Sequence, residues 1–184
     1  MISRFLLLVL LLFSLSGKSQ SDTNLLCVKL SDLTKVQSFN ATEKVHYTWL
    51  IDADSNVHCE GRLKNDLETG FWKYNYRHGV QKAQGFYASG KKTGCWKFYH
   101  PKGALASMGE YEYGLKTGYW KFYNQGEQLT EEGWYAQNKR DGWWKFYQAG
   151  KLVEEGSFAA DKKTGYWRFY QNGMLTSVTI IEEE

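Results

Sequence analysis

A strong excess of charge of either sign is missing from this chain of 184 residues. Its 23 lysines and arginines against 20 acidic residues give a net charge of +3 at pH 7. Loss of the first 20 residues, which include Arg4 and Lys18 but no acidic residue, would lower the net charge to +1. Domains that bind nucleic acid are usually strongly basic, so the composition argues against a nucleic-acid partner.

A hydrophobic run long enough to span a bilayer is also missing. The longest run, from Phe5 to Phe13, is much shorter than the roughly 20 apolar residues of a transmembrane helix. It follows Arg4 and precedes the small and polar stretch from Ser14 to Gln20, a pattern typical of a secretory signal peptide. The sequence therefore predicts export to the periplasm, the cell surface or the medium, with cleavage near Gln20. An uncleaved anchor is the alternative.

The short motifs of common catalytic sites are absent. There is no G-x-S-x-G elbow, no phosphate loop and no dinucleotide fingerprint. The four histidines lack the spacing of metal ligands. Asp52, Asp54 and Asn56 imitate a calcium loop, but Val57 and Leu63 stand where its glycine and its last glutamate belong, so a hairpin turn is expected instead. We expect no enzymatic activity, no cofactor and no metal.

Cysteines number only three. In an oxidising compartment Cys27 and Cys59 could form a disulfide that ties the N-terminal region to the first repeat. Cys95 stands where related segments have an aromatic residue. We expect it to be a small packed side chain and a free thiol, not a nucleophile.

What the chain has in abundance is one repeated unit. The segments TGFWKYN, TGCWKFY, TGYWKFY, DGWWKFY and TGYWRFY begin at residues 69, 93, 117, 141 and 164, so three steps are 24 residues long and the last is 23. A fixed period of this size is typical of repeat architectures. Each copy has an aromatic-rich run, a turn and a second run, which predicts a β-hairpin, and Asn172-Gly173 is a strong turn signal. The fixed glycines argue against helices.

The predicted fold is all-β: a single-layer antiparallel meander of about six hairpins, elongated and twisted. Residues 1–20 form the signal peptide, and residues 21–44 form an extension that adds a strand or packs over the first repeat. The repeat domain covers residues 45–184. It divides into a degenerate copy 45–68, clear copies 69–92, 93–116, 117–140 and 141–163, and a truncated copy 164–184.

Side chains alternate across a strand, so the repeat predicts two different faces. We expect the face with the five repeated tryptophans to be buried, and a glycine inside each second strand to make room for an aromatic ring. The opposite face should be half-solvated, with lysine stems along tyrosine rings, and it is the expected binding surface. That surface comprises Tyr99, Tyr119, Lys121, Tyr123, Trp143, Lys145, Tyr147, Tyr166, Arg168 and Tyr170.

Charged residues also follow the repeat. Glu131-Glu132 and Glu154-Glu155 are expected as cross-strand partners of lysines. Seven basic residues fall between successive copies, where solvated turn positions are favoured over an anion-binding rim. They are Lys91, Lys92, Lys116, Lys139, Arg140, Lys162 and Lys163.

The segments GEYEYGLKTGYWKFYNQG (109–126) and GSFAADKKTGYWRFYQNG (156–173) resemble the MORN repeat in its G-x-W variant. Gly109, Tyr111, Gly114, Gly118 and Gly126 occupy the repeat's positions, as does Lys116, and Trp120 stands where the common form has another glycine. The resemblance covers residues 45 to about 176 and implies a curved, aromatic-lined sheet. Bacterial proteins of this kind are often labelled antitoxins of toxin–antitoxin systems, and eukaryotic relatives act as scaffolding or membrane-associated modules.

Three functions follow as hypotheses. The leading one is a non-catalytic binding or scaffold module for a protein partner in the cell envelope. The second is glycan or cell-wall binding on exposed aromatic rings, and the third is binding to an anionic membrane surface through the basic residues. An antitoxin-like or immunity role against a toxin that acts in the envelope follows from the family resemblance.

Overall fold

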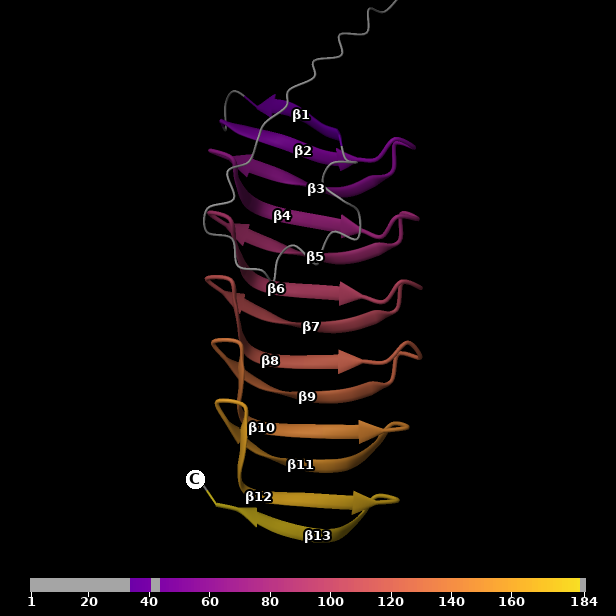
Figure 1. The fold of residues 1–184 in the computed structure, drawn as a ribbon, viewed down its shortest axis with the longest axis vertical. Coiled ribbons are helices and arrows are strands. Elements are labelled where there is room, and N and C mark those ends of the chain that lie inside the picture. The colour runs from indigo at the N-terminus through magenta and orange to yellow at the C-terminus, as the bar shows by residue number, and fades with distance from the viewer. Residues whose placement is uncertain (1–33, 41–43, 183–184) are drawn as a thin grey trace, which may run out of the picture.

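The computed structural model describes residues 34–40 and 44–182, and within them the chain forms one antiparallel β-sheet (Figure 1). Its 13 strands lie in chain order, so each strand pairs with its neighbours in the sequence. The predicted all-β, single-layer meander is confirmed. The signal peptide and residues 21–33 of the extension lie outside the described residues. The rest of the extension includes β1, which pairs with β2 as an added strand.

Figure 1 shows the strands stacked along the long axis of the molecule, with turns at both sides. In chain order they are β1 (Thr34–Asn40), β2 (Val45–Ile51), β3 (Val57–Lys64), β4 (Leu67–Asn75), β5 (Gln81–Ala88), β6 (Lys91–Tyr99), β7 (Leu105–Glu112), β8 (Leu115–Tyr123), β9 (Leu129–Ala136), β10 (Lys139–Gln148), β11 (Lys151–Ala159), β12 (Lys162–Gln171) and β13 (Met174–Ile181).

The turns have the chemistry expected from the sequence. Asn172 and Gly173, between β12 and β13, both have positive φ angles (51° and 81°), as a two-residue type I′ turn requires. Between β2 and β3 the Asp52 carboxylate accepts hydrogen bonds from the backbone N–H groups of Asp54 (3.0 Å) and Asn56 (2.9 Å). The prediction of a hairpin turn at this aspartate-rich segment is therefore confirmed.

One packing arrangement, the tryptophan–glycine step, recurs on the tryptophan face. This face carries Trp72, Trp96, Trp120, Trp144 and Trp167. Each indole ring lies on a glycine of the preceding strand. A Cβ atom added to Gly109 would lie 2.2 Å from the Trp120 ring, and one added to Gly133 would lie 2.3 Å from the Trp144 ring. Only glycine leaves room for this approach, as predicted. The indole N–H of Trp144 also donates to the backbone carbonyl of Trp134 (2.9 Å).

The stacked rings form one continuous core along the sheet. Trp120 stacks on Phe122 of its own strand (centroids 5.9 Å apart), and Phe122 stacks on Trp144 two strands further on (6.3 Å). The last four tryptophans of the face have no exposed surface. A single-layer sheet thus acquires a buried core because each repeat covers its neighbour.

The step stops at both ends of the sheet. Thr179 of β13 stands opposite Trp167, where the inner strands have glycine, and no later strand in the described residues carries a tryptophan to cover it. On β2, Thr48 lies opposite Gly61, and it is buried. The 12-residue separation of Trp49 from Gly61, which matches that of Trp144 from Gly156, predicts that Trp49 is the equivalent of the repeated tryptophan, but Thr48 occupies that position instead. Trp49 pairs with Glu60 and lies on the other face, because the degenerate copy shifts the register.

Candidate functional site

The tyrosine face is the opposite side of the same strands, and it carries the ten residues predicted to bind. The structure places Tyr99 on β6; Tyr119, Lys121 and Tyr123 on β8; Trp143, Lys145 and Tyr147 on β10; and Tyr166, Arg168 and Tyr170 on β12. Hydrogen bonds and charge contacts gather most of these residues into two networks on this face, around Glu132 and Glu155.

Glu132 of β9 is the centre of the first network. Its carboxylate accepts a hydrogen bond from the Tyr147 hydroxyl (2.7 Å), and the Lys121 ammonium lies 3.8 Å away. Partial burial raises the pKa of Tyr119 to about 12, and the charge of Glu132 and a hydrogen bond to it act in the same direction. Lys145 faces the same glutamate in the strand register. The expected role of Glu132 as a cross-strand partner of lysines is confirmed.

Glu155 of β11 forms the equivalent centre one copy later. It accepts hydrogen bonds from the Tyr170 hydroxyl (2.7 Å), an Arg168 N–H (3.3 Å) and the Trp143 indole N–H (3.3 Å). Burial alone would raise the pKa of Glu155, but these hydrogen bonds and the charge of Arg168 outweigh it and lower the pKa. The carboxylate is therefore held ionised, with its partners in fixed positions.

Two exposed aromatic pairs lie on the same face. Phe71 and Phe86 pair across β4 and β5, with ring centroids 5.2 Å apart and exposed fractions of 39% and 48%. Tyr119 and Trp134 pair across β8 and β9 at 5.3 Å, with 37% and 51% exposed. The predicted binding surface contains only residues of the first strand of each hairpin from Tyr99 onward, so Phe71, Phe86 and Trp134 are not part of it. Phe86 and Trp134 lie 48 residues apart, which is two repeat periods, so the period together with strand alternation could have identified both.

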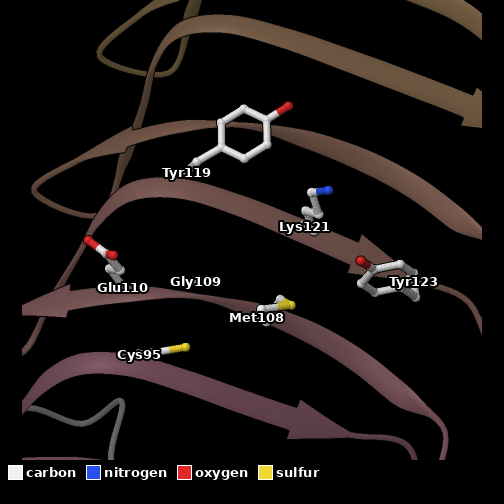
Figure 2. Close-up of a pocket in the computed structure, with 7 residues that line it drawn as sticks. All are labelled: Cys95, Met108, Gly109, Glu110, Tyr119, Lys121 and Tyr123. Atoms are coloured by element: carbon white, nitrogen blue, oxygen red, sulfur yellow. The ribbon is translucent and has the colours of Figure 1, made fainter.

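A shallow hollow of about 270 Å³ lies over β6, β7 and β8 on the tyrosine face (Figure 2). It lies where three positions depart from the repeat, one of which is Glu110, since the neighbouring copies have Phe86 and Trp134 there. Cys95 replaces the usual aromatic residue and pairs with Glu110, and Met108 replaces the glutamate or glutamine of neighbouring copies. The hollow is lined by Cys95, Met108, Gly109, Glu110, Tyr119, Lys121 and Tyr123.

The cysteine predictions have different outcomes. Cys95 is a free thiol, but it is exposed, so its expected packing is wrong: the neighbouring side chains of Met108 and Glu110 do not cover it. Cys59 is a buried free thiol on the tryptophan face, and burial raises its pKa to about 12. Cys27 lies outside the described residues, so its pairing with Cys59 stays a prediction.

The basic residues between copies were expected to be solvated turn residues, but this expectation is wrong for some of them. They are first or second residues of even-numbered strands, and four of them, all second residues, cover aromatic rings of the tryptophan face. The Lys116 ammonium lies 4.6 Å from the ring centroid of Trp120, 5.0 Å from that of Tyr135 and 5.3 Å from that of Phe122. Burial lowers the pKa of Lys116. The other three are Lys92, Arg140 and Lys163.

Comparison with known proteins gives no family for this chain: no family model matches it, and no curated protein matches it. The likeness to MORN repeats thus stays a prediction from the motif. In the described part of the chain, no helix is long and apolar enough to cross a membrane. No group of three or more histidine, cysteine or acidic side chains there could hold a metal ion.

Proposed function

We propose that this protein is a non-catalytic, exported binding module, and that its tyrosine face holds a protein partner in the cell envelope. One observation carries the proposal: large aromatic side chains are exposed at repeat positions along one face of a sheet whose own core lies on the other. They are Phe71, Phe86, Tyr119, Trp134 and Tyr166. Contiguous exposed apolar surface marks interaction sites. Tyrosine and tryptophan supply contact area at a small entropic cost.

The charges of the face favour a protein over an anionic surface. Lys121 and Arg168 lie beside the carboxylates of Glu132 and Glu155, so both signs alternate along the face. Lys92, Lys116 and Arg140, which would have formed a basic rim, lie over aromatic rings of the opposite face. Alternating charges suit a complementary protein surface, since like-charge contacts penalise the wrong partner.

Crosslinking in the native envelope tests this proposal. We expect a single crosslinked protein, and a variant that combines Tyr119→Ser with Trp134→Ser should reduce its yield at least about tenfold, because central aromatic anchors dominate binding energy. Tyr113→Ser is the matched control, since Tyr113 is 75% exposed but lies in the turn after β7. Equal yields from all three proteins would contradict the proposal, provided that circular dichroism shows each of them folded.

The hollow favours a second candidate, binding of a glycan or cell-wall polymer. The Tyr119 and Tyr123 rings can stack on a sugar ring, and Lys121 and Glu110 offer hydrogen-bonding groups to its hydroxyls. Isolated peptidoglycan or envelope polysaccharide would then retain the protein on a pull-down, and Tyr123→Ala would release it while Tyr113→Ala would not. Retention that both variants share would reject the hollow as the glycan site.

Export is part of the proposal and has its own test. The mature N-terminus should fall between about residues 17 and 22, as expected for a cleaved signal peptide. Intact mass and N-terminal sequencing of the native protein measure it. A native protein found in the cytosol with Met1 still at its N-terminus would contradict export and the envelope location of the partner. It would not contradict binding through the tyrosine face.

A further inference from the structure

The network around Glu132 has a counterpart one repeat period earlier that lacks the central carboxylate. Counting back 24 residues from Glu132 leads to Met108, which offers only a thioether, a weak hydrogen-bond acceptor. The same count leads from Tyr147, whose hydroxyl donates to Glu132 at 2.7 Å, to Tyr123. The repeat therefore keeps the donor at this place and omits the acceptor.

The positive charge of the Glu132 network is kept as well. Lys121, whose ammonium lies 3.8 Å from the Glu132 carboxylate, has Lys97 as its counterpart one period earlier. Lys97 pairs in the strand register with Gln84 and with Met108, and neither of these side chains is charged. Lys121 pairs with Met108 from the other side. Met108 thus stands between two lysines, without the carboxylate that Glu132 supplies in the next copy.

The hollow of Figure 2 provides room for a carboxylate at this place. Tyr119 hydrogen-bonds Glu132, and the counterpart of Tyr119 one period earlier is Cys95. A thiol is much smaller than a phenol ring, so this difference leaves open space beside Met108, and the space is the hollow of about 270 Å³. The missing carboxylate and the missing ring therefore occur together, on the same face and in the same copy.

The two ends of the hollow carry opposite charges. Figure 2 shows the Tyr123 hydroxyl directed toward Lys121, and these two groups form the donor end. The Glu110 carboxylate forms the other end, where a Cβ atom added to Gly118 would lie 3.2 Å from its Oε2 atom. An incoming carboxylate is therefore attracted to the donor end and repelled from the Glu110 end.

We propose that the donor end of the hollow binds a carboxylate of the protein partner, an aspartate or glutamate side chain that takes the place of the omitted glutamate. This inference rests on the proposed function for the source of the carboxylate, and it names a group that the partner presents to this face. Glu132 shows what the same set of donors does with a carboxylate: a tyrosine hydroxyl donates to it and a lysine lies beside it. Hydrogen bonds of this charge-assisted kind are short and strong. A protein side chain is favoured over an acidic sugar, because the internal template is itself a glutamate side chain.

Methionine-methyl NMR tests the site without the partner. Met108 lines the hollow, and Met174, which is 70% exposed on β13, serves as an internal control. We expect Nα-acetyl-glutamate α-amide to shift the Met108 methyl signal saturably and to leave the Met174 signal in place. Nα-acetyl-glutamine amide has the same shape without the charge and should bind at least about tenfold more weakly. No saturable shift with the acidic compound, or equal binding of both compounds, would overturn the proposal.

Glucuronate, titrated in the same way, tests the acidic sugar as a source of the carboxylate. We expect it to bind more weakly than Nα-acetyl-glutamate α-amide. Tighter binding of glucuronate would overturn the assignment to a protein side chain.

Two substitutions, each with a matched control, test the assigned donors. Tyr123→Phe removes only the hydroxyl and should weaken binding of the acidic compound at least about tenfold. Tyr147→Phe should not weaken it, because Glu132 already occupies that hydroxyl. Lys97→Gln should weaken binding about threefold, whereas Lys73→Gln should not, since a glutamate already lies 3.7 Å from the Lys73 ammonium. Equal effects of a variant and its control would contradict the assignment.

The NMR titration and the crosslinking experiment can fail separately. Saturable binding of the acidic compound to a protein that crosslinks to no partner would support the carboxylate site and reject the proposed function. A single crosslinked partner, together with no binding of the acidic compound, would support the proposed function and reject this inference.

Discussion

The two faces of the sheet use alternate residues of the same strands, yet they repeat with different strictness. The tryptophan face has the same indole in every full copy, because the ring must meet a glycine of the preceding strand. One slot of the tyrosine face changes from Phe71 to Cys95, Tyr119, Trp143 and Tyr166. Packing restricts the first face, and solvent leaves the second free to vary. Variation in a regular array therefore indicates where recognition can be built.

Carboxylates show the same contrast. Burial raises the pKa of Glu131 on the tryptophan face, although Arg140 and Lys116 oppose the change. On the tyrosine face, burial would also raise the pKa of Glu155, but its hydrogen-bond donors prevail and lower it. The ionised form of Glu131 on the tryptophan face is thus destabilised by burial, whereas the ionised form of Glu155 on the tyrosine face is stabilised by its hydrogen-bond donors.

Truncation of neighbouring residues on opposite faces should give the largest difference in the free energy of unfolding. Trp120→Ala should lower the free energy of unfolding by about 3–5 kcal/mol, because it removes a fully buried ring. Tyr119→Ala removes a ring that is 37% exposed and should cost about 1 kcal/mol. Urea melts of both variants measure the difference, and equal losses would mean that the faces are assigned wrongly.

A single added methyl group should also distinguish the faces. Gly109→Ala places a Cβ atom 2.2 Å from the Trp120 ring and should cost about 3 kcal/mol through overpacking. Gly126→Ala is the control, since its nearest neighbour would be Asn124 Oδ1 at 3.4 Å in an exposed turn. Denaturant melts of the pair should show a large loss only for Gly109. A small loss there would mean that the indole ring can move away.

The pH dependence of stability should have opposite signs for the two glutamates. The lowered pKa of Glu155 stabilises the folded protein above its ordinary pKa of 4.5, and this contribution disappears as pH falls through the lowered value. Glu155→Gln should therefore cost about 1–2 kcal/mol at neutral pH and little in acid. The raised pKa of Glu131 acts in reverse, so Glu131→Gln should stabilise the protein at neutral pH and lose that advantage in acid. Melts across this pH range that gave both variants the same sign would contradict the contrast.

Restoring the repeat on the tyrosine face should barely affect stability. Cys95→Tyr replaces an exposed side chain by the residue of the next copy, and we expect a change within about 0.5 kcal/mol. Thermal melts measure this change. The same substitution should fill the hollow beside Met108 and Tyr123. It therefore distinguishes glycan binding in the hollow from protein binding by the exposed aromatic residues. A loss of several kcal/mol would show that Cys95 is part of the core.

The period and its aromatic residues were sufficient to predict the sheet, the buried tryptophans and the glycines beneath them, because each follows from strand alternation and ring size. The shift that puts Thr48 in place of Trp49 was not predictable, since a degenerate copy lacks the motif that sets the register. The position of Lys116 over aromatic rings depends on side-chain conformation, which a turn-like sequence does not reveal. The exposure of Cys95 depends on Met108 and Glu110, neighbours that come from another strand.

Deletion of one copy tests most directly the claim that the tryptophan–glycine step carries the fold. Removal of residues 117–140 joins Lys116 to Asp141 and should set Trp144 on Gly109, as Trp120 is now. We expect a folded sheet with cooperative unfolding and a smaller denaturant dependence, because less surface is exposed on unfolding. The shorter deletion of residues 117–128 removes a tryptophan strand but keeps its glycine partner, so it should do more damage. Loss of cooperative unfolding in the longer deletion, or equal tolerance of both, would contradict the account.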